Sequence, residues 1–168
     1  NVNPALIPEL LNSKISSSQN VAEVKKFRPG LSTMMIHLAM DDLPPWKAAE
    51  AKEFNYIHIA PYIDDLAMTY TQAAAGLLPS SPALVIGQPT VTDSSRAPAG
   101  KHVLWIQVRV LPLDIKGDAR GEISGNTWDQ IGEQYADRII EIIENYAPGI
   151  KSKILSRKVL TPTDLERY

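Results

Sequence analysis

The sequence predicts an α+β domain in which a mixed, mostly antiparallel sheet carries helices chiefly on one face. Strand-like and helix-like segments alternate along the chain without an internal repeat. The predicted strands at residues 31–40, 55–60 and 101–111 each place aliphatic side chains on one face and aromatic or polar side chains on the other. A long amphipathic helix at residues 128–146 has the apolar face that such a sheet needs as a cover.

The first part of the chain contains two helix signals followed by a strand. Short helices are predicted at residues 4–11 and 18–26, the second of them closed by a Pro-Gly pair. The strand at residues 31–40 follows and ends before a pair of prolines that indicates a turn.

The middle of the chain alternates strand, helix and strand. Residues 55–60 are predicted as a short strand and residues 62–75 as a helix with two aspartates in its first turn. Gly76 is the expected end of this helix, because glycine readily adopts the left-handed conformation that closes a helix. Strands at residues 84–88 and 101–111 flank a long loop.

The C-terminal part contains the clearest helix signal of the chain. Apolar residues recur at helical spacing over residues 128–146, and Thr127 with Gln130 forms a predicted capping box. A last strand is predicted at residues 153–160, and residues 115–126 are predicted to be an exposed loop. The charged residues of the helix are expected to form its solvated face: Asp129, Glu133, Asp137, Arg138, Glu141 and Glu144.

The mixed face of the predicted sheet is the first candidate for a binding surface. Trp105, Tyr56 and Met35 are large apolar side chains to leave in water, so we expect this face to meet a ligand or another domain. The alternative is an antiparallel sheet with one face exposed to solvent. The candidate residues on this face are Met35, His37, Tyr56, His58, Trp105, Gln107 and Arg109.

The loop within residues 89–105 is the second candidate. Pro89 and Pro98 each fix a backbone angle, and the Asp-Ser-Ser segment between them can form hydrogen bonds with its own backbone. Arg96 is therefore expected on a stiff loop, where its planar guanidinium could orient the head group of a ligand. The alternative is a structural hairpin in which Arg96 pairs with Asp93 or another nearby carboxylate.

The same loop carries a family resemblance. Its succession of Pro, Asp-Ser, Ala-Pro and Gly-Lys-His resembles the substrate-binding part of the phytoene dehydrogenase-related FAD oxidoreductases, within the carotenoid desaturase and amine oxidase superfamily. Four other segments resemble the same family more weakly and occur in the same order along the chain as in the family: residues 1–4, 27–43, 74–79 and 160–166. The resemblance implies that residues 1–168 are one substrate-binding domain whose sheet roofs a cavity over the flavin. It also implies that Arg96 lies on the flavin side and would orient a substrate head group or the polar rim of that flavin.

The resemblance also implies the cofactor and the partners. FAD would bind segments of the parent flavoenzyme outside this chain, because no GxGxxG motif follows a predicted strand here. The absence of an initiator Met fits an excised piece, which is expected not to bind FAD alone. The partners would be the FAD-binding domain and a small apolar or amphipathic substrate, oriented for oxidation, desaturation or saturation by the flavin. The alternative is a stand-alone ligand-binding or protein-interaction module without redox activity.

Composition narrows the remaining classes of function. The 168 residues suit one domain, and 44% hydrophobic with 21% charged residues argue against disorder. Zero cysteines exclude disulfides and thiol catalysis, and no apolar run approaches the roughly 20 residues that cross a bilayer. A net charge of −2 with scattered basic residues does not indicate a basic surface for binding nucleic acid. The three histidines lack metal-ligand spacing, and no catalytic residue is indicated.

Overall fold

The fold was analysed in a computed structural model. It describes residues 10, 23–24, 26–27, 30–60 and 62–167. By its internal contacts the chain divides into two units, Asn1–Gly30 and Leu31–Tyr168, and the second unit contains the sheet and the long helices. Most of the two helices predicted near the N-terminus lies outside the described residues. That residues 1–168 form a single domain stays a prediction.

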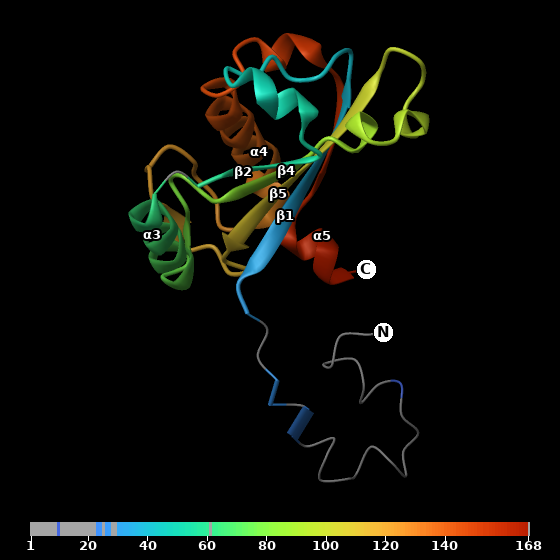
Figure 1. The fold of residues 1–168 in the computed structure, drawn as a ribbon. Coiled ribbons are helices and arrows are strands. Elements are labelled where there is room, and N and C mark those ends of the chain that lie inside the picture. The colour runs from blue at the N-terminus through green and yellow to red at the C-terminus, as the bar shows by residue number, and fades with distance from the viewer. Residues whose placement is uncertain (1–9, 11–22, 25, 28–29, 61, 168) are drawn as a thin grey trace. The chain divides into compact units, whose positions relative to one another are not determined.

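Five strands form one antiparallel sheet. In spatial order they are β2 (Tyr56–Ile59), β4 (Leu84–Gly87), β5 (His102–Leu111), β1 (Ser32–Met40) and β7 (Ile154–Leu160) (Figure 1). Two short strands, β3 (Leu77–Leu78) and β6 (Gly117–Asp118), pair in parallel as a separate small sheet. The predicted α+β class is confirmed, and each of the five predicted strands begins and ends within one residue of its observed bounds.

The alternation of side chains along the strands fixes the register of the sheet. Met34, Ile36 and Leu38 of β1 are buried, as are Leu104 and Ile106 of β5. Ile36 lies directly opposite Ile106, so the aliphatic side chains of the two strands meet on one face. A shift of one residue would turn every one of these side chains toward the opposite face, which is why burial specifies this register strongly.

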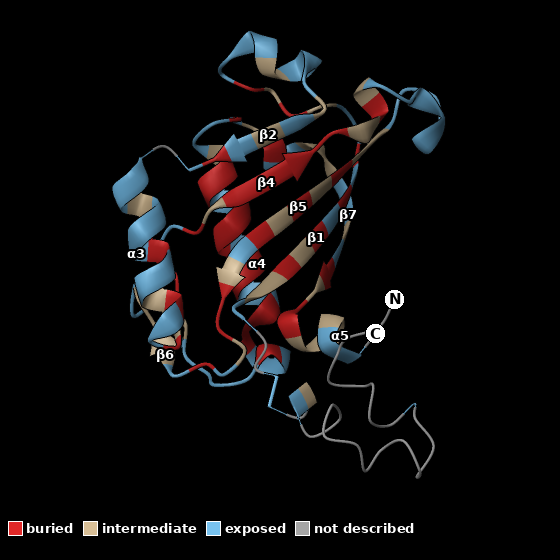
Figure 2. Cartoon of the chain, turned by 60° about the horizontal axis from the view of Figure 1, so that its bottom comes forward, coloured by how far each residue is buried: buried red, intermediate tan, exposed pale blue. Residues whose placement is uncertain are grey.

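Helix α4 (Trp128–Glu144) covers the aliphatic face of the sheet. Its residues Ile131 and Ile139 are fully buried within the core. In Figure 2 α4 lies behind the sheet, and the opposite face of the sheet has no helix across it. Helix α3 (Ile63–Ala74) lies at the side of the sheet, and the short α5 (Pro162–Arg167) contacts β1 and β7. The helices therefore lie chiefly on one face, as predicted.

Several local features differ from the prediction. Thr127 is the N-cap residue of α4, but its side chain makes no capping hydrogen bond, so the predicted capping box does not form. Gln130 instead accepts a weak hydrogen bond of 3.4 Å from the backbone N–H of Asn126. Helix α5 and the four described 3-10 segments were not predicted, because such short elements have too few residues to show a period.

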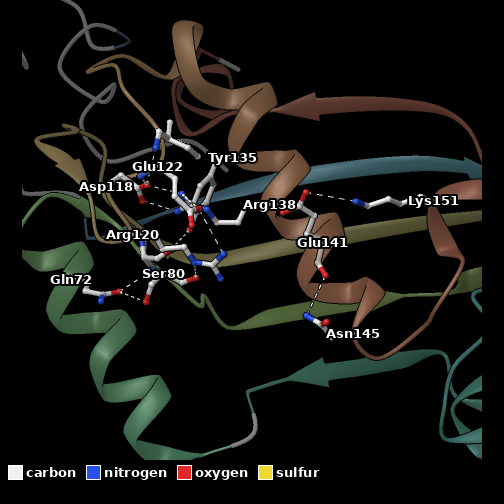
Figure 3. Close-up of polar contacts among 12 residues, drawn as sticks. Gln72, Ser80, Asp118, Arg120, Glu122, Tyr135, Arg138, Glu141, Asn145 and Lys151 are labelled. Atoms are coloured by element: carbon white, nitrogen blue, oxygen red, sulfur yellow. Dashed lines mark hydrogen bonds and ion pairs between the residues drawn. The ribbon is translucent and has the colours of Figure 1, made fainter.

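A buried ion pair joins α4 to the strand β6. The two terminal nitrogens of Arg138 each donate a hydrogen bond of 2.6 Å to one oxygen of Asp118, and the side chains are only 3% and 1% exposed (Figure 3). Asp118 also accepts hydrogen bonds from the backbone N–H groups of Glu122 and Ile123. The guanidinium lies 5.4 Å from the centre of the Tyr135 ring. Both carboxylate oxygens of Asp118 and both terminal nitrogens of Arg138 thus have partners that stabilise their charges.

Two predictions about this region were wrong. Residues 115–126 are not simply an exposed loop, since they contain β6 and a buried carboxylate, and Arg138 does not belong to the solvated face of α4. Burial by itself would raise the pKa of Asp118, but the hydrogen bonds from Arg138 and from the backbone outweigh it and hold that pKa far below its ordinary value. The pair therefore stays ionised inside the fold.

Candidate functional site

The face of the sheet opposite α4 carries a row of side chains that crosses all five strands. Tyr56, Gly87, Trp105, His37 and Lys158 lie opposite one another on β2, β4, β5, β1 and β7. Residues directly paired across antiparallel strands project from the same face. The strand pairing therefore brings three predicted site residues, Tyr56, Trp105 and His37, into one line.

The neighbouring row contains three more of the predicted residues. Its members, from β2 to β7, are His58, Val85, Gln107, Met35 and Leu160. Arg109 lies farther along β5, opposite Thr33 of β1, beside a register shift and just before Val110, which has a φ of 65°. The structure thus places all seven predicted face residues on the same side of the sheet.

Trp105 lies across the backbone of Gly87. A Cβ atom at Gly87 would be only 2.2 Å from Cε2 of the indole, so no other residue fits there without moving the ring. On the far side of this glycine the Trp105 ring meets Tyr56 edge-on, with centroids 5.5 Å apart and an interplanar angle of 62°. Tyr56 remains 56% exposed. An aromatic pair therefore forms a partly open apolar surface at the middle of this face.

The loop between β4 and β5 is folded by its own hydrogen bonds. It contains two 3-10 turns, η3 (Pro89–Val91) and η4 (Ser94–Arg96), with Asp93 between them. Asp93 accepts hydrogen bonds from the backbone N–H of Ser95 at 3.1 Å, from its hydroxyl at 2.5 Å, and from Arg96 Nε at 3.3 Å. The two bonds from Ser95, followed by the bond from Arg96, lower the pKa of the Asp93 carboxyl. The local pairing of Arg96 that the sequence offered as the alternative is therefore present.

A buried glutamine fixes the start of this loop. Gln88 is fully buried and accepts a hydrogen bond of 2.8 Å from the Trp46 indole N–H. Its amide nitrogen donates to the backbone carbonyls of Ala51 and Phe54 at 3.0 and 2.8 Å. Since each of these bonds lies inside the fold, the loop begins from a rigid point.

A groove of about 610 Å³ lies between this loop and strands β1, β5 and β7. Three predicted site residues line it, namely Arg96, His37 and Trp105, together with Pro89 and Lys158. Its size falls within the range of small-molecule binding sites. Folding thus brings the loop candidate Arg96 together with two of the seven sheet-face candidates, His37 and Trp105.

A second, smaller hollow of about 280 Å³ lies elsewhere on the fold. His58 and Arg109 line it, together with Leu66 and Tyr70 of α3. The remaining predicted residues, Met35, Tyr56 and Gln107, line neither of these two hollows. The predicted residues therefore share one face but not one pocket.

The lining of the larger groove is unbalanced in charge. Arg96, Arg157 and Lys158 line it, whereas none of its described lining residues is an aspartate or glutamate. Arg157 is neutralised from elsewhere, because it pairs with Glu133 at 2.6 Å and with Asp137. The groove therefore combines an indole surface with positive charge.

Sequence reasoning missed two residues of this site. Lys158 was not selected because only the pairing of β7 with β1 places it beside His37. Gly87 carried a usable signal, since a glycine within a strand often marks a close approach of another group. Among the described residues no group of three metal-ligating side chains comes together, and none of the described helices is long and apolar enough to span a membrane.

Comparison with known proteins identifies the relatives of this chain. No family model matches it. It is 32% identical over 142 residues to pyridine nucleotide-disulfide oxidoreductase domain-containing protein 2 of Rattus norvegicus, a match that covers 79% of this chain and 23% of that protein. Phytoene dehydrogenase of Streptomyces griseus is 31% identical over 90 residues, with 53% of this chain and 17% of that protein covered. Phytoene desaturase (lycopene-forming) of Pseudescherichia vulneris is 32% identical over 82 residues, with 48% and 15% covered.

These matches agree with the resemblance found in the loop between β4 and β5. The chain spans less than a quarter of the length of the curated relatives named above. It is thus homologous to a part of the phytoene dehydrogenase-related oxidoreductases.

Proposed function

We propose that this chain is the substrate-binding part of an FAD-dependent oxidoreductase. In this proposal the open face of the sheet orients an apolar or amphipathic substrate against a flavin held by the rest of the protein. Relatives that are named oxidoreductase, dehydrogenase and desaturase support the class of reaction. The observation that carries the proposal is a sheet face with Trp105, Tyr56 and Met35 on it and no helix across it.

This face has the chemical character of a substrate surface. The Trp105 and Tyr56 rings give an apolar contact area at its centre, which can bind hydrocarbon and displace water. His37 lies in the row of Trp105, and Gln107 lies in the neighbouring row. Both are polar and can fix the orientation of a substrate by hydrogen bonds. The strands under these side chains are hydrogen-bonded on both sides in β1, β4 and β5, so the surface is held rigidly.

The flavin would contact this chain only at that face. The strand-to-helix connections of the described residues contain no GxGxxG sequence, so they do not form the usual site for a dinucleotide pyrophosphate. When bound by the rest of the protein, the flavin would supply the oxidation chemistry. The residues of this chain would bind, orient and desolvate the substrate.

The test compares two truncations of apolar residues in the complete protein, one half-buried and one exposed. Trp105→Ala removes the centre of the open face, and Leu155→Ala removes a residue that is 59% exposed at the edge strand β7, outside both hollows. We expect Trp105→Ala to raise KM by about tenfold or more, as loss of an aromatic contact area does, and Leu155→Ala to leave it unchanged. Equal KM values for wild type and Trp105→Ala, at equal Tm, would overturn the proposal.

A further inference from the structure

The larger groove has basic side chains in its lining and no carboxylate among its described lining residues, although Asp93 pairs with Arg96 Nε from outside that lining. Arg96 and Lys158 line it, no described lining residue is a carboxylate, and Trp105 provides an apolar surface beside them. We infer that this groove binds an amphipathic anion, whose carboxylate or phosphate group lies between Arg96 and Lys158 and whose apolar part lies on Trp105. The inference rests on the proposed function, and it names the substrate class for that site.

Arg96 is held in a position that leaves its donors available. Asp93 engages only the Nε atom, at 3.3 Å, and in the described part of the chain the two terminal nitrogens have no hydrogen-bond partner. The side chain is 61% exposed although it is paired. A guanidinium fixed in this way presents terminal N–H groups to a carboxylate or phosphate. The local ion pair with Asp93 therefore leaves the two terminal nitrogens of Arg96 available to a ligand.

Lys158 supplies the second charge from the opposite side of the groove. It lies on the edge strand β7, directly across from His37, and forms no ion pair with the described residues. Its neighbour Arg157 shows the contrast, since Glu133 and Asp137 already neutralise it. Among the described residues, Lys158 thus has no ion pair, and Arg96 keeps its two terminal nitrogens for an anion although its Nε pairs with Asp93.

Charge and shape together favour an amphipathic anion over a wholly apolar ligand. An anion between Lys158 and the terminal nitrogens of Arg96 gains charge-assisted hydrogen bonds that a wholly apolar ligand cannot make. The apolar lining includes Ala39, Val103 and Trp105, which a purely ionic ligand would leave exposed to water. A ligand with an anionic group and an apolar part can contact both the basic and the apolar side chains of this groove of about 610 Å³.

The experiment measures binding to the full 168-residue chain by isothermal titration calorimetry. The probes share one ring system and differ in charge: 2-naphthoate, the neutral 2-naphthamide and 2-naphthyl phosphate. We expect the two anions to bind about tenfold more tightly than the amide, and the gap to shrink at high salt. Tighter binding of the carboxylate assigns the site to a substrate acid, whereas tighter binding of the phosphate assigns it to a phosphorylated ligand or nucleotide.

Charge-removing variants locate the anion. Arg96→Gln and Lys158→Gln should each raise the Kd of 2-naphthoate by about three- to tenfold and leave the Kd of 2-naphthamide unchanged. Arg96→Lys should retain part of the preference because it keeps the charge but loses the planar donor pair. Lys52→Gln is the matched control, since Lys52 is exposed on the 3-10 segment η2 (Ala49–Glu53) and does not line the groove.

The outcomes separate this inference from the proposed function. Equal affinities for 2-naphthoate and 2-naphthamide in the wild-type chain would overturn the anion site, while binding of both probes would still support an apolar substrate surface. The same anion preference in the Arg96→Gln and Lys158→Gln variants, with unchanged Tm, would also overturn it. Absence of binding by all three probes would overturn the anion site, and the KM of Trp105→Ala in the complete protein would then decide the proposed function independently.

Discussion

Replacing Arg138 with methionine should destabilise this fold strongly, because it leaves a buried carboxylate without its counter-ion. Arg138 and Asp118 are 3% and 1% exposed and share two hydrogen bonds of 2.6 Å. Methionine keeps most of the volume of arginine, so the loss is mainly electrostatic. Asp118 would retain only its two bonds from the backbone N–H groups of Glu122 and Ile123.

The expected size of this loss follows from the burial of the pair. Removal of one partner of a buried ion pair costs about 3–5 kcal/mol. The double variant Arg138→Met with Asp118→Leu removes both charges and should recover most of that loss, because the desolvation penalty disappears as well. Arg167→Met is the matched control, since Arg167 is 64% exposed and pairs loosely with Asp129 at 3.6 Å. The control should change stability by less than about 0.5 kcal/mol.

Urea denaturation followed by circular dichroism measures these differences directly. A cost below about 1 kcal/mol for Arg138→Met, at an unchanged m-value, would refute the argument that burial makes this pair sensitive. A double variant that is as unstable as Arg138→Met would refute the electrostatic explanation and point to lost packing against Tyr135.

Three further predictions concern the carboxylate, the aromatic pair and the cofactor. The pKa of Asp118 is held below its ordinary value of 3.8, so its contribution to stability is complete above that value and is lost as the pH falls through the lower pKa of the folded state. Unfolding free energies measured from pH 5 down to pH 2 should therefore fall less steeply in Asp118→Asn than in the wild-type chain, and equal slopes for the two proteins would contradict this. Gly87→Ala should displace the Trp105 ring, whose Cε2 lies 2.2 Å from the position of the new Cβ, and shift the tryptophan emission spectrum. An unchanged spectrum with full stability would show that the indole does not rest on that glycine. The chain alone should fold without binding FAD, and saturable stoichiometric quenching of flavin fluorescence at low micromolar FAD would contradict that expectation.

The regular elements could be predicted from the sequence because their signals are local. The alternation of Met34, Ile36 and Leu38 with polar neighbours indicates a strand whatever the rest of the chain does, since successive side chains point to opposite faces. The recurrence of isoleucines in α4 likewise predicts which side of that helix is buried. These periods were sufficient for the α+β class and for the strand bounds.

The position of a single charged residue was beyond such local signals. Arg138 has the same type of sequence neighbours as the exposed acids of α4, yet it is buried because it pairs with Asp118 of strand β6, 20 residues earlier. The helical period alone cannot show that partner. The same holds for Arg96, whose pairing with Asp93 is local, whereas its place beside Trp105 depends on how the loop folds over the sheet.

Local patterns in the sequence were enough to predict the five strands of the large sheet, the long helix, the face that each strand presents, and the resemblance to phytoene dehydrogenase-related oxidoreductases. Which residues of those faces meet follows from the folded chain alone. Pairing of β7 with β1 brings Lys158 to His37, and pairing of β4 with β5 sets Gly87 beneath Trp105. Side-chain period is a property of neighbouring residues, whereas strand order and register depend on the burial of the whole core.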